Sequence, residues 1–324
     1  MSDLLEKCPV CRALVDEEDL FCANCGTEVP QRQGQETQTD SVKHSFDCRG
    51  CGASMSYDAS AQTIRCPFCG STDLSAEVQE VKTLVPRRVV AFQVDRDAAV
   101  RAMRKWLGKG FWRPSDLSES AAVTKMAPVY VPYWVFNALT FSYWTADSSD
   151  TPFGARGDWF PLAGSHHGKY SGLLIGASGV LTPSETAAIC PFDLAAAVEP
   201  DQVDLDRYVA EQFRVQRKYA RPLARQNLEE LERKACAQYV PGRSRNLRVN
   251  MRLEGLTSEP VLLPVWIMAY AYQDQLFRFL LNGQNGNAAG QAPTSWKKVG
   301  TAVAIAIGLF VLVALFVILA SAAR

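Results

Sequence analysis

The chain has 324 residues with 34 basic and 34 acidic side chains, so its net charge is zero, but the charge is unevenly distributed. Residues 1–30 carry a net charge of −5, which disfavours contact with nucleic acid phosphates there. The same stretch is acidic and already contains cysteines, which excludes a cleaved signal peptide.

Eight of the ten cysteines form four Cys-x-x-Cys pairs, arranged as two sets. The first set is Cys8, Cys11, Cys22 and Cys25, and the second is Cys48, Cys51, Cys66 and Cys69. Ten residues separate the pairs in the first set and fourteen in the second, which is zinc-ribbon spacing. In a reducing compartment such pairs bind metal more readily than they form disulfides; disulfides and a rubredoxin-like iron site remain as alternatives. The pattern predicts two structural Zn²⁺ ions, each closed by four thiolates, with no open position for catalysis.

The cysteine sets predict two small domains, a first ribbon over residues 1–30 and a second over 42–74, joined by a polar linker at 31–41. Glycines at positions 26, 52 and 70 are expected to turn backbone N–H groups toward the thiolates. Each ribbon is too small to fold without its ion. Cys190 and Cys236 lie outside any pair, and we expect them to be small buried apolar residues.

Residues 86–281 are expected to form a central α+β domain with an antiparallel sheet. A helix is predicted from Asp95 or Asp97 to Gly108, and a longer one from 204 to 239, interrupted at Pro222. Alternating apolar residues predict strands around 139–143 and 247–253.

A short motif occurs twice: Pro128-Val-Tyr-Val-Pro-Tyr-Trp134 and Pro260-Val-Leu-Leu-Pro-Val-Trp266. Each copy begins a stretch with aromatic residues in the pattern of a strand. The repeat suggests duplicated half-domains, although four identities in seven can also arise by chance.

Residues 207–252 carry twelve basic and four acidic side chains. Such a stretch either contacts anionic lipid or an acidic partner, or is a solvated helix face, and the second reading is favoured.

The C-terminal part predicts a turn-rich spacer over 282–298 and a transmembrane helix over 299–320. The 22 residues of that helix contain no charge and one polar side chain, Thr301. Lys297 and Lys298 precede it, so the positive-inside rule predicts a single-pass protein of the inner membrane with its bulk in the cytoplasm. Small residues at 300, 304 and 308 permit a weak helix–helix contact, and hence a homo-oligomer.

The sequence contains none of the common catalytic motifs: no metalloprotease His-Glu-x-x-His, nucleophile elbow, phosphate-binding loop or dinucleotide fingerprint. The segment Gly164-Ser-His-His-Gly168 is the most reactive-looking stretch, but adjacent histidines on a strand point to opposite faces and cannot share a metal. An exposed turn is the favoured interpretation of this segment, and no enzymatic activity is expected.

These features together resemble bacterial zinc-ribbon membrane proteins of the YdjG type. The resemblance rests on the ribbons, the Pro-x-Trp strand entries, the run from Leu263 to Gly286 and the final helix. It implies a role in envelope maintenance beside flotillin-like SPFH proteins and phage-shock protein A. The chain departs from the pattern in having two ribbons and Arg12 where a glycine often follows the knuckle.

The favoured hypothesis is a membrane-anchored adaptor whose ribbons dock protein partners. A membrane-tethered nucleic-acid-binding regulator and an unrecognised membrane-associated enzyme are the alternatives. Because the ribbons are acidic or neutral, nucleic acid is the less favoured partner.

Overall fold

The structure is a computed structural model, and it describes residues 6–15, 22, 25, 27, 44–57, 66–69, 71–77, 84–273 and 275–322. The predicted linker 31–41 and the glycines at 26 and 70 lie outside these residues.

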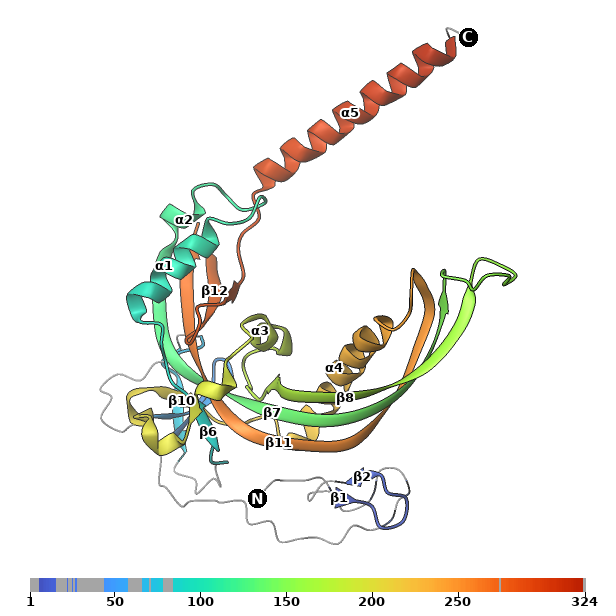
Figure 1. Cartoon of the computed structure of the whole chain (residues 1–324). Helices are drawn as coiled ribbons and strands as arrows, with labels where there is room; N and C mark the ends of the chain where they lie inside the picture. The colour runs from blue at the N-terminus through green and yellow to red at the C-terminus, as the bar shows by residue number, and fades with distance from the viewer. Residues whose placement is uncertain are drawn as a thin grey trace.

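Most of the described chain is built on one mixed sheet, which curves into an arc (Figure 1). Within the described residues it has eleven strands, with the path β13-β12-β11-β7-β10-β4-β3-β5, while β6, β8 and β9 pair off this path. Its strands are β3 (His44–Cys48), β4 (Ser54–Tyr57), β5 (Leu74–Glu77), β6 (Arg88–Val90), β7 (Ala122–Ser148), β8 (Phe160–Gly176), β9 (Ala197–Val198), β10 (Val209–Glu211), β11 (Ser244–Tyr272), β12 (Gln275–Asn282) and β13 (Ala288–Gly290). A separate two-stranded sheet joins β1 (Glu6–Lys7) to β2 (Leu14–Val15). The helices are α1 (Arg96–Leu107), α2 (Leu117–Ser120), α3 (Pro183–Ala188), α4 (Arg217–Ala237) and α5 (Trp296–Ala322), and three short 3₁₀ turns cover Leu194–Ala196, Pro200–Gln202 and Leu205–Arg207.

The long strands β7 and β11 form the centre of the sheet. They have 27 and 29 residues and pair antiparallel over almost their full length. The predicted strands 139–143 and 247–253 lie inside them, which confirms both predictions. From position 138 to 148 of β7, buried and more exposed residues alternate, because one face of this part is covered and the other meets solvent.

The repeated motif occupies equivalent places in β7 and β11. Its two copies pair antiparallel with each other, with Pro128 opposite Trp266 and Trp134 opposite Pro260. Each tryptophan donates its indole N–H to a backbone carbonyl 2.8 Å away, Trp134 to Val215 and Trp266 to Val94. An approximate two-fold axis therefore passes between the copies, as a duplication predicts.

Each half of the domain has the order strand, helix, long strand, hairpin strand. The first half is β6-α1-β7-β8 and the second is β10-α4-β11-β12. The short strand of each half pairs parallel to the long strand of the other half. The helices also contact the opposite half, since α1 packs on β11 and β12, while α4 lies on the concave side of the sheet against β8 and β7 of the first half as well as β11 of its own (Figure 1). The hydrophobic core of each half is thus completed by the other half.

Helix α1 confirms the first helix prediction. Asp95 caps it by accepting a hydrogen bond from the Ala98 N–H at 2.7 Å. Ala99, Met103 and Leu107 form its buried face.

The predicted helix 204–239 is wrong at its N-terminal end. Only Arg217–Ala237 is α-helical, whereas Leu205–Arg207 forms a 3₁₀ turn and Val209–Glu211 forms strand β10. The apolar residues at 205, 209 and 213 follow helical spacing, but Val209 and Glu211 are buried between β7 and β4, where extended backbone completes two ladders. Pro222 lies inside α4 near its first turn and does not interrupt it.

The second ribbon is part of the main sheet. Its strand β4 pairs with β10, with Met55 opposite Glu211, and the Gln212 N–H donates to the Ser54 carbonyl at 3.1 Å. Met55, Cys48, Cys66 and Phe68 belong to the same buried cluster as Val129. The second ribbon and the central domain therefore share one hydrophobic core.

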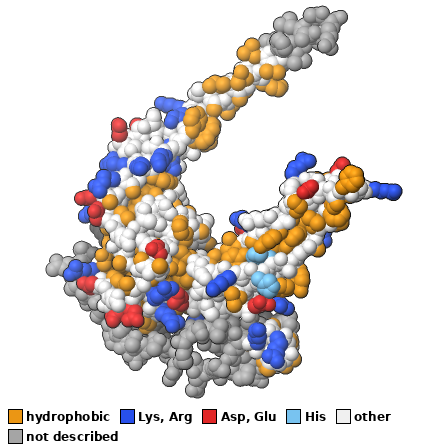
Figure 2. Space-filling model, viewed as in Figure 1, with side chains coloured by type: hydrophobic (Ala, Val, Ile, Leu, Met, Phe, Trp, Pro, Cys, Tyr) orange, Lys and Arg blue, Asp and Glu red, His pale blue; other side chains and the backbone are white. Residues whose placement is uncertain are grey.

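Helix α5 projects away from the sheet, and its described side chains are mostly exposed and apolar (Figures 1 and 2). By length and composition it can cross a membrane, because the window Trp296–Val313 has a mean hydropathy of 1.7 and none of it is buried in the protein. The helix begins three residues before the predicted span.

Candidate metal centres

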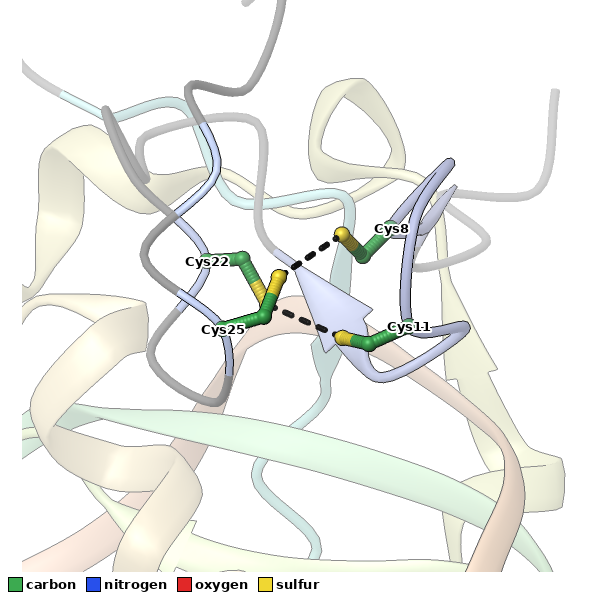
Figure 3. A group of neighbouring side chains, drawn as sticks. All are labelled: Cys8, Cys11, Cys22 and Cys25. Carbon is green, nitrogen blue, oxygen red and sulfur yellow. Dashed lines mark hydrogen bonds between the residues drawn. The ribbon is translucent and has the colours of Figure 1, made fainter.

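The structure brings the four cysteines of each predicted set together. In the first ribbon the four sulfurs converge on one point, with Cys8 and Cys25 Sγ atoms 3.6 Å apart and those of Cys11 and Cys22 3.5 Å apart (Figure 3). In the second ribbon the Cys48–Cys69 and Cys51–Cys66 sulfur separations are both 3.5 Å. Within each set all four sulfurs lie within 4.8 Å of one another.

These separations fit a tetrahedral metal ion and not a disulfide. A disulfide brings two sulfurs to about 2.05 Å. Four thiolates about 2.3 Å from one Zn²⁺ ion are about 3.8 Å apart, close to the values in both ribbons. Each set can therefore hold one metal ion with all four of its sulfurs.

The backbone of each ribbon is folded in the same way around its cysteines. The N–H of the first cysteine in each pair donates to the carbonyl five residues later, at 2.7 to 2.9 Å in all four pairs. Gly52, after the second cysteine of its pair, has a φ of 74°, and Arg12, at the equivalent position in the first ribbon, has a φ of 61°. Glycine adopts this left-handed conformation without steric cost, as predicted at 52, whereas Arg12 adopts it against the usual preference.

Local N–H groups also stabilise thiolate at Cys48. Burial alone would raise the pKa of Cys48, but the N–H of Cys51, the Cys69 thiol and the N–H of Gly50 outweigh it and lower the pKa to about 7. A thiol that ionises near neutral pH is ready to bind a metal ion.

The segment predicted as an exposed turn is in fact the middle of β8. His166 and His167 point to opposite faces of the strand, as their adjacency predicts. His167 lies against the ring of Phe141, with centroids 4.5 Å apart. His166 lies under α4, where its Nδ1 is 2.9 Å from the carboxylate of Glu232.

Cys236 is fully buried, as expected, but it is not isolated from polar groups. Its thiol lies in a cluster with His166 and Glu232, whose ligand atoms are within 4.8 Å of one another. Glu232 does not stand out in the sequence as a candidate site residue. Its spacing of four residues from Cys236 on one helix was the available signal. Cys190 is only partly buried, and its thiol donates to the Thr186 carbonyl at 3.3 Å.

Glu211 lies at the seam between the second ribbon and the central domain. Its carboxylate Oε1 accepts hydrogen bonds from the Ser178 hydroxyl and the Gly179 N–H, both at 2.8 Å. Only 2% of the residue is exposed, and this burial raises its pKa to about 7 despite those hydrogen bonds.

Glu211→Gln is expected to remove a pH dependence of stability. The folded protein holds a proton on Glu211 that the unfolded chain releases near pH 4.5, so the free energy of unfolding should fall as pH rises from about 4.5 to about 7. The shift is worth about 3 kcal/mol at most. Denaturant unfolding of both proteins at pH 5 and pH 8 measures it, and an equal pH dependence in the two would contradict this account.

The exposed face of the long strands opposite α4 combines aromatic and basic side chains. We call it the outer face; its residues are Leu139, Phe141, Tyr143, His167, Lys169, Arg248 and Arg252. Tyr143 packs edge-on against Phe141, and the Arg252 guanidinium lies over the Phe141 ring at 5.5 Å. This surface is not evident from the sequence, because its residues come from three strands and β11 is distant in the chain from β7 and β8.

The basic stretch 207–252 does not form one surface. It is divided between the turn at Leu205–Arg207, helix α4 and strand β11. On α4, Arg225 pairs with Glu229 and Lys234 with Glu230, as on a solvated helix face. Binding of anionic lipid by this stretch, the less favoured alternative, is not tested by these contacts.

Comparison with known proteins finds similarity to the uncharacterized protein YdjG of Bacillus subtilis (strain 168). The two are 24% identical over an alignment of length 312, and the match covers 79% of this chain and 92% of the relative. No protein-family model matches the chain, and no solved structure matches it.

Proposed function

We propose that this protein is a membrane-anchored zinc-ribbon adaptor that docks protein partners at the cytoplasmic face of the membrane. Each cysteine set holds one structural Zn²⁺ ion, and the role is not enzymatic. The convergence of four sulfurs on one point in each ribbon supports closed metal sites, which stabilise a docking surface and leave no position for a substrate.

The observation that carries this proposal is the continuity of the second ribbon with the main sheet. Because β4 is paired to β10 and shares the core around Met55, the ribbon has a fixed orientation on the domain. The apolar helix α5 then tethers that domain as one pass through the membrane. Lys297 and Lys298 at its start favour a cytoplasmic position for the domain.

The first ribbon presents an apolar contact that suits a protein partner. Val10 lies in the knuckle between Cys8 and Cys11 and exposes 68% of its surface. A branched apolar side chain on a rigid knuckle is a suitable interface anchor. The resemblance to YdjG-type proteins suggests flotillin-like SPFH proteins and phage-shock protein A as partners, in envelope maintenance.

Val10→Glu is expected to abolish partner capture while both cysteine sets keep their metal. A charge buried in a protein interface without a partner costs several kcal/mol, so recovery should fall at least about tenfold. The full chain is purified in mild detergent from its own cells, and co-purifying proteins are quantified by mass spectrometry.

The matched control for this capture experiment is Leu276→Glu, because Leu276 is 71% exposed on β12, far along the sequence from the ribbons. Docking through this knuckle is refuted if the wild type and Val10→Glu capture partner proteins equally, or if only the control variant loses them. Recovery of SPFH or phage-shock proteins tests the choice of partner separately.

A second candidate function, a membrane-tethered nucleic-acid-binding regulator, is favoured by the outer face. Phe141 and Tyr143 offer rings on which bases can stack, while Lys169, Arg248 and Arg252 supply positive charge beside them. Such combinations bind single strands with little sequence preference.

Replacing Phe141 by Ala and Arg252 by Glu tests this second function. If the outer face binds single-stranded RNA, affinity should fall at least about tenfold in the double variant, and wild-type binding should weaken steeply with salt. Fluorescence anisotropy of a labelled oligonucleotide with the detergent-solubilised full chain measures both. The control is Tyr219→Ala with Arg225→Glu on α4, and absence of salt-dependent binding by the wild type would exclude the function.

A further inference from the structure

A buried cluster of three metal-ligand side chains lies beneath α4, remote in sequence from both cysteine sets. Glu232 and Cys236 are four residues apart on α4 and so share one face of the helix. His166 on β8 faces them from the sheet. Glu232 and Cys236 are completely buried, and the His166 side chain is 17% exposed.

The sheet provides room and hydrogen bonds for the carboxylate. A Cβ at Gly168 would collide with Oε1 of Glu232, so only glycine at this position leaves space for the carboxylate. The Thr140 hydroxyl donates to the same oxygen, Oε1, and the second oxygen, Oε2, faces His166 Nδ1 at 2.9 Å. Oε1 is thus held by the sheet while Oε2 faces His166, and Tyr170 also hydrogen-bonds to the carboxylate. Outer hydrogen bonds of this kind orient the carboxylate ligand in metal sites.

The charges of the cluster favour a cation. A thiolate and a carboxylate held close together in a buried site would repel each other, and a cation between them would remove that repulsion. Two anionic ligands and a neutral imidazole would balance the charge of a divalent cation, so the occupied buried site would be electrically neutral. Among the described residues, Glu232 pairs with the imidazole of His166.

The distances require only a small adjustment to admit an ion. The three ligand atoms lie within 4.8 Å of one another. Nitrogen and oxygen ligands about 2.05 Å from one tetrahedral ion are about 3.4 Å apart, so the contact between His166 and Glu232 would open by about half an ångström. The mixed nitrogen, oxygen and sulfur donors suit Zn²⁺ or Co²⁺ and not Mg²⁺ or Ca²⁺.

We propose that His166, Glu232 and Cys236 bind a third metal ion, a divalent transition metal of the Zn²⁺ class, which clamps α4 to β8. Water or a neighbouring hydroxyl supplies the fourth ligand. The ion joins a helix of the second half of the domain to a strand of the first half, and so stabilises the contact between the halves.

Metal counting on the full chain tests the site. The protein is loaded with Zn²⁺ under anaerobic reducing conditions in mild detergent and desalted, and its zinc content is measured by mass spectrometry. We expect about three ions per chain in the wild type and about one fewer in His166→Ala and in Cys236→Ser. The matched controls are His167→Ala, the neighbour on the opposite face, and Cys190→Ser, the other unpaired cysteine; both should equal the wild type.

Loading with Co²⁺ shows which site has lost its ion, so that partial misfolding of a variant is not mistaken for loss of the third site. The Co²⁺ spectrum of the wild type should contain a charge-transfer band of the strength that a single thiolate ligand gives, in addition to the bands of the four-thiolate sites. In the His166 and Cys236 variants the single-thiolate band should disappear while the four-thiolate bands remain. The proposal is wrong if the wild type and His166→Ala contain equal zinc, or if the wild-type Co²⁺ spectrum shows four-thiolate sites alone. In either case His166 and Glu232 form a hydrogen-bonded pair without a metal ion.

Discussion

Cys48→Ser is expected to remove one metal ion per chain and to detach the second ribbon from the main sheet. An isolated zinc module draws its folding energy from its ion, on the order of 10 kcal/mol. Without the ion, Met55 and Phe68 leave the shared core, which costs the central domain about 3 to 6 kcal/mol. The damage therefore extends beyond the ribbon.

Hydrogen exchange read by mass spectrometry can follow this detachment. In Cys48→Ser, protection should be lost in β4 and reduced in β10, because one edge of β10 is hydrogen-bonded to β4 while its other edge stays paired with β7. The matched variant is Cys8→Ser in the first ribbon, whose strands form a sheet of their own. It should also lose one ion but leave the exchange of β10 unchanged. If β10 stays protected in Cys48→Ser, the ribbon is not structurally coupled to the domain.

The double variant Leu309→Arg, Val313→Arg is expected to leave the membrane fraction. Both side chains are exposed on α5 near the middle of the apolar span, and each arginine costs about 2.5 to 3.5 kcal/mol at the centre of a membrane helix. Together they oppose insertion by about 5 to 7 kcal/mol, enough to move most of the protein to the soluble fraction.

Alkaline extraction followed by immunoblotting of pellet and supernatant measures the redistribution. The control replaces the same residues with alanine, which keeps the helix apolar and should stay in the pellet. Full retention of the arginine variant in the pellet would mean that α5 is not the membrane anchor.

Local sequence patterns predicted the parts of this protein that short-range chemistry determines. The four Cys-x-x-Cys pairs specify their own knuckles, because each pair folds around the sulfurs and backbone N–H groups within five residues. Asp95 marks the start of α1, and the alternation around 139–143 marks a strand, since both signals depend on periodicity and capping alone.

The errors occurred where a distant segment overrides a local pattern. Residues 205–213 follow helical spacing, but Val209 and Glu211 lie between two strands that need extended backbone partners. His166 and His167 suggest a turn when read alone, yet β7 and α4 place one of them inside the protein and the other on its surface.

The two cysteine sets, the apolar final helix and the repeated motif can be read directly from the chain, because each depends on residues that are close together in it. The pairing of each half's short strand with the other half's long strand, the joining of the second ribbon to the main sheet, and the meeting of His166 with Glu232 and Cys236 are visible only in three dimensions. Those arrangements arise from burial and strand pairing between segments far apart in sequence, and no local periodicity records which distant surface a segment will cover.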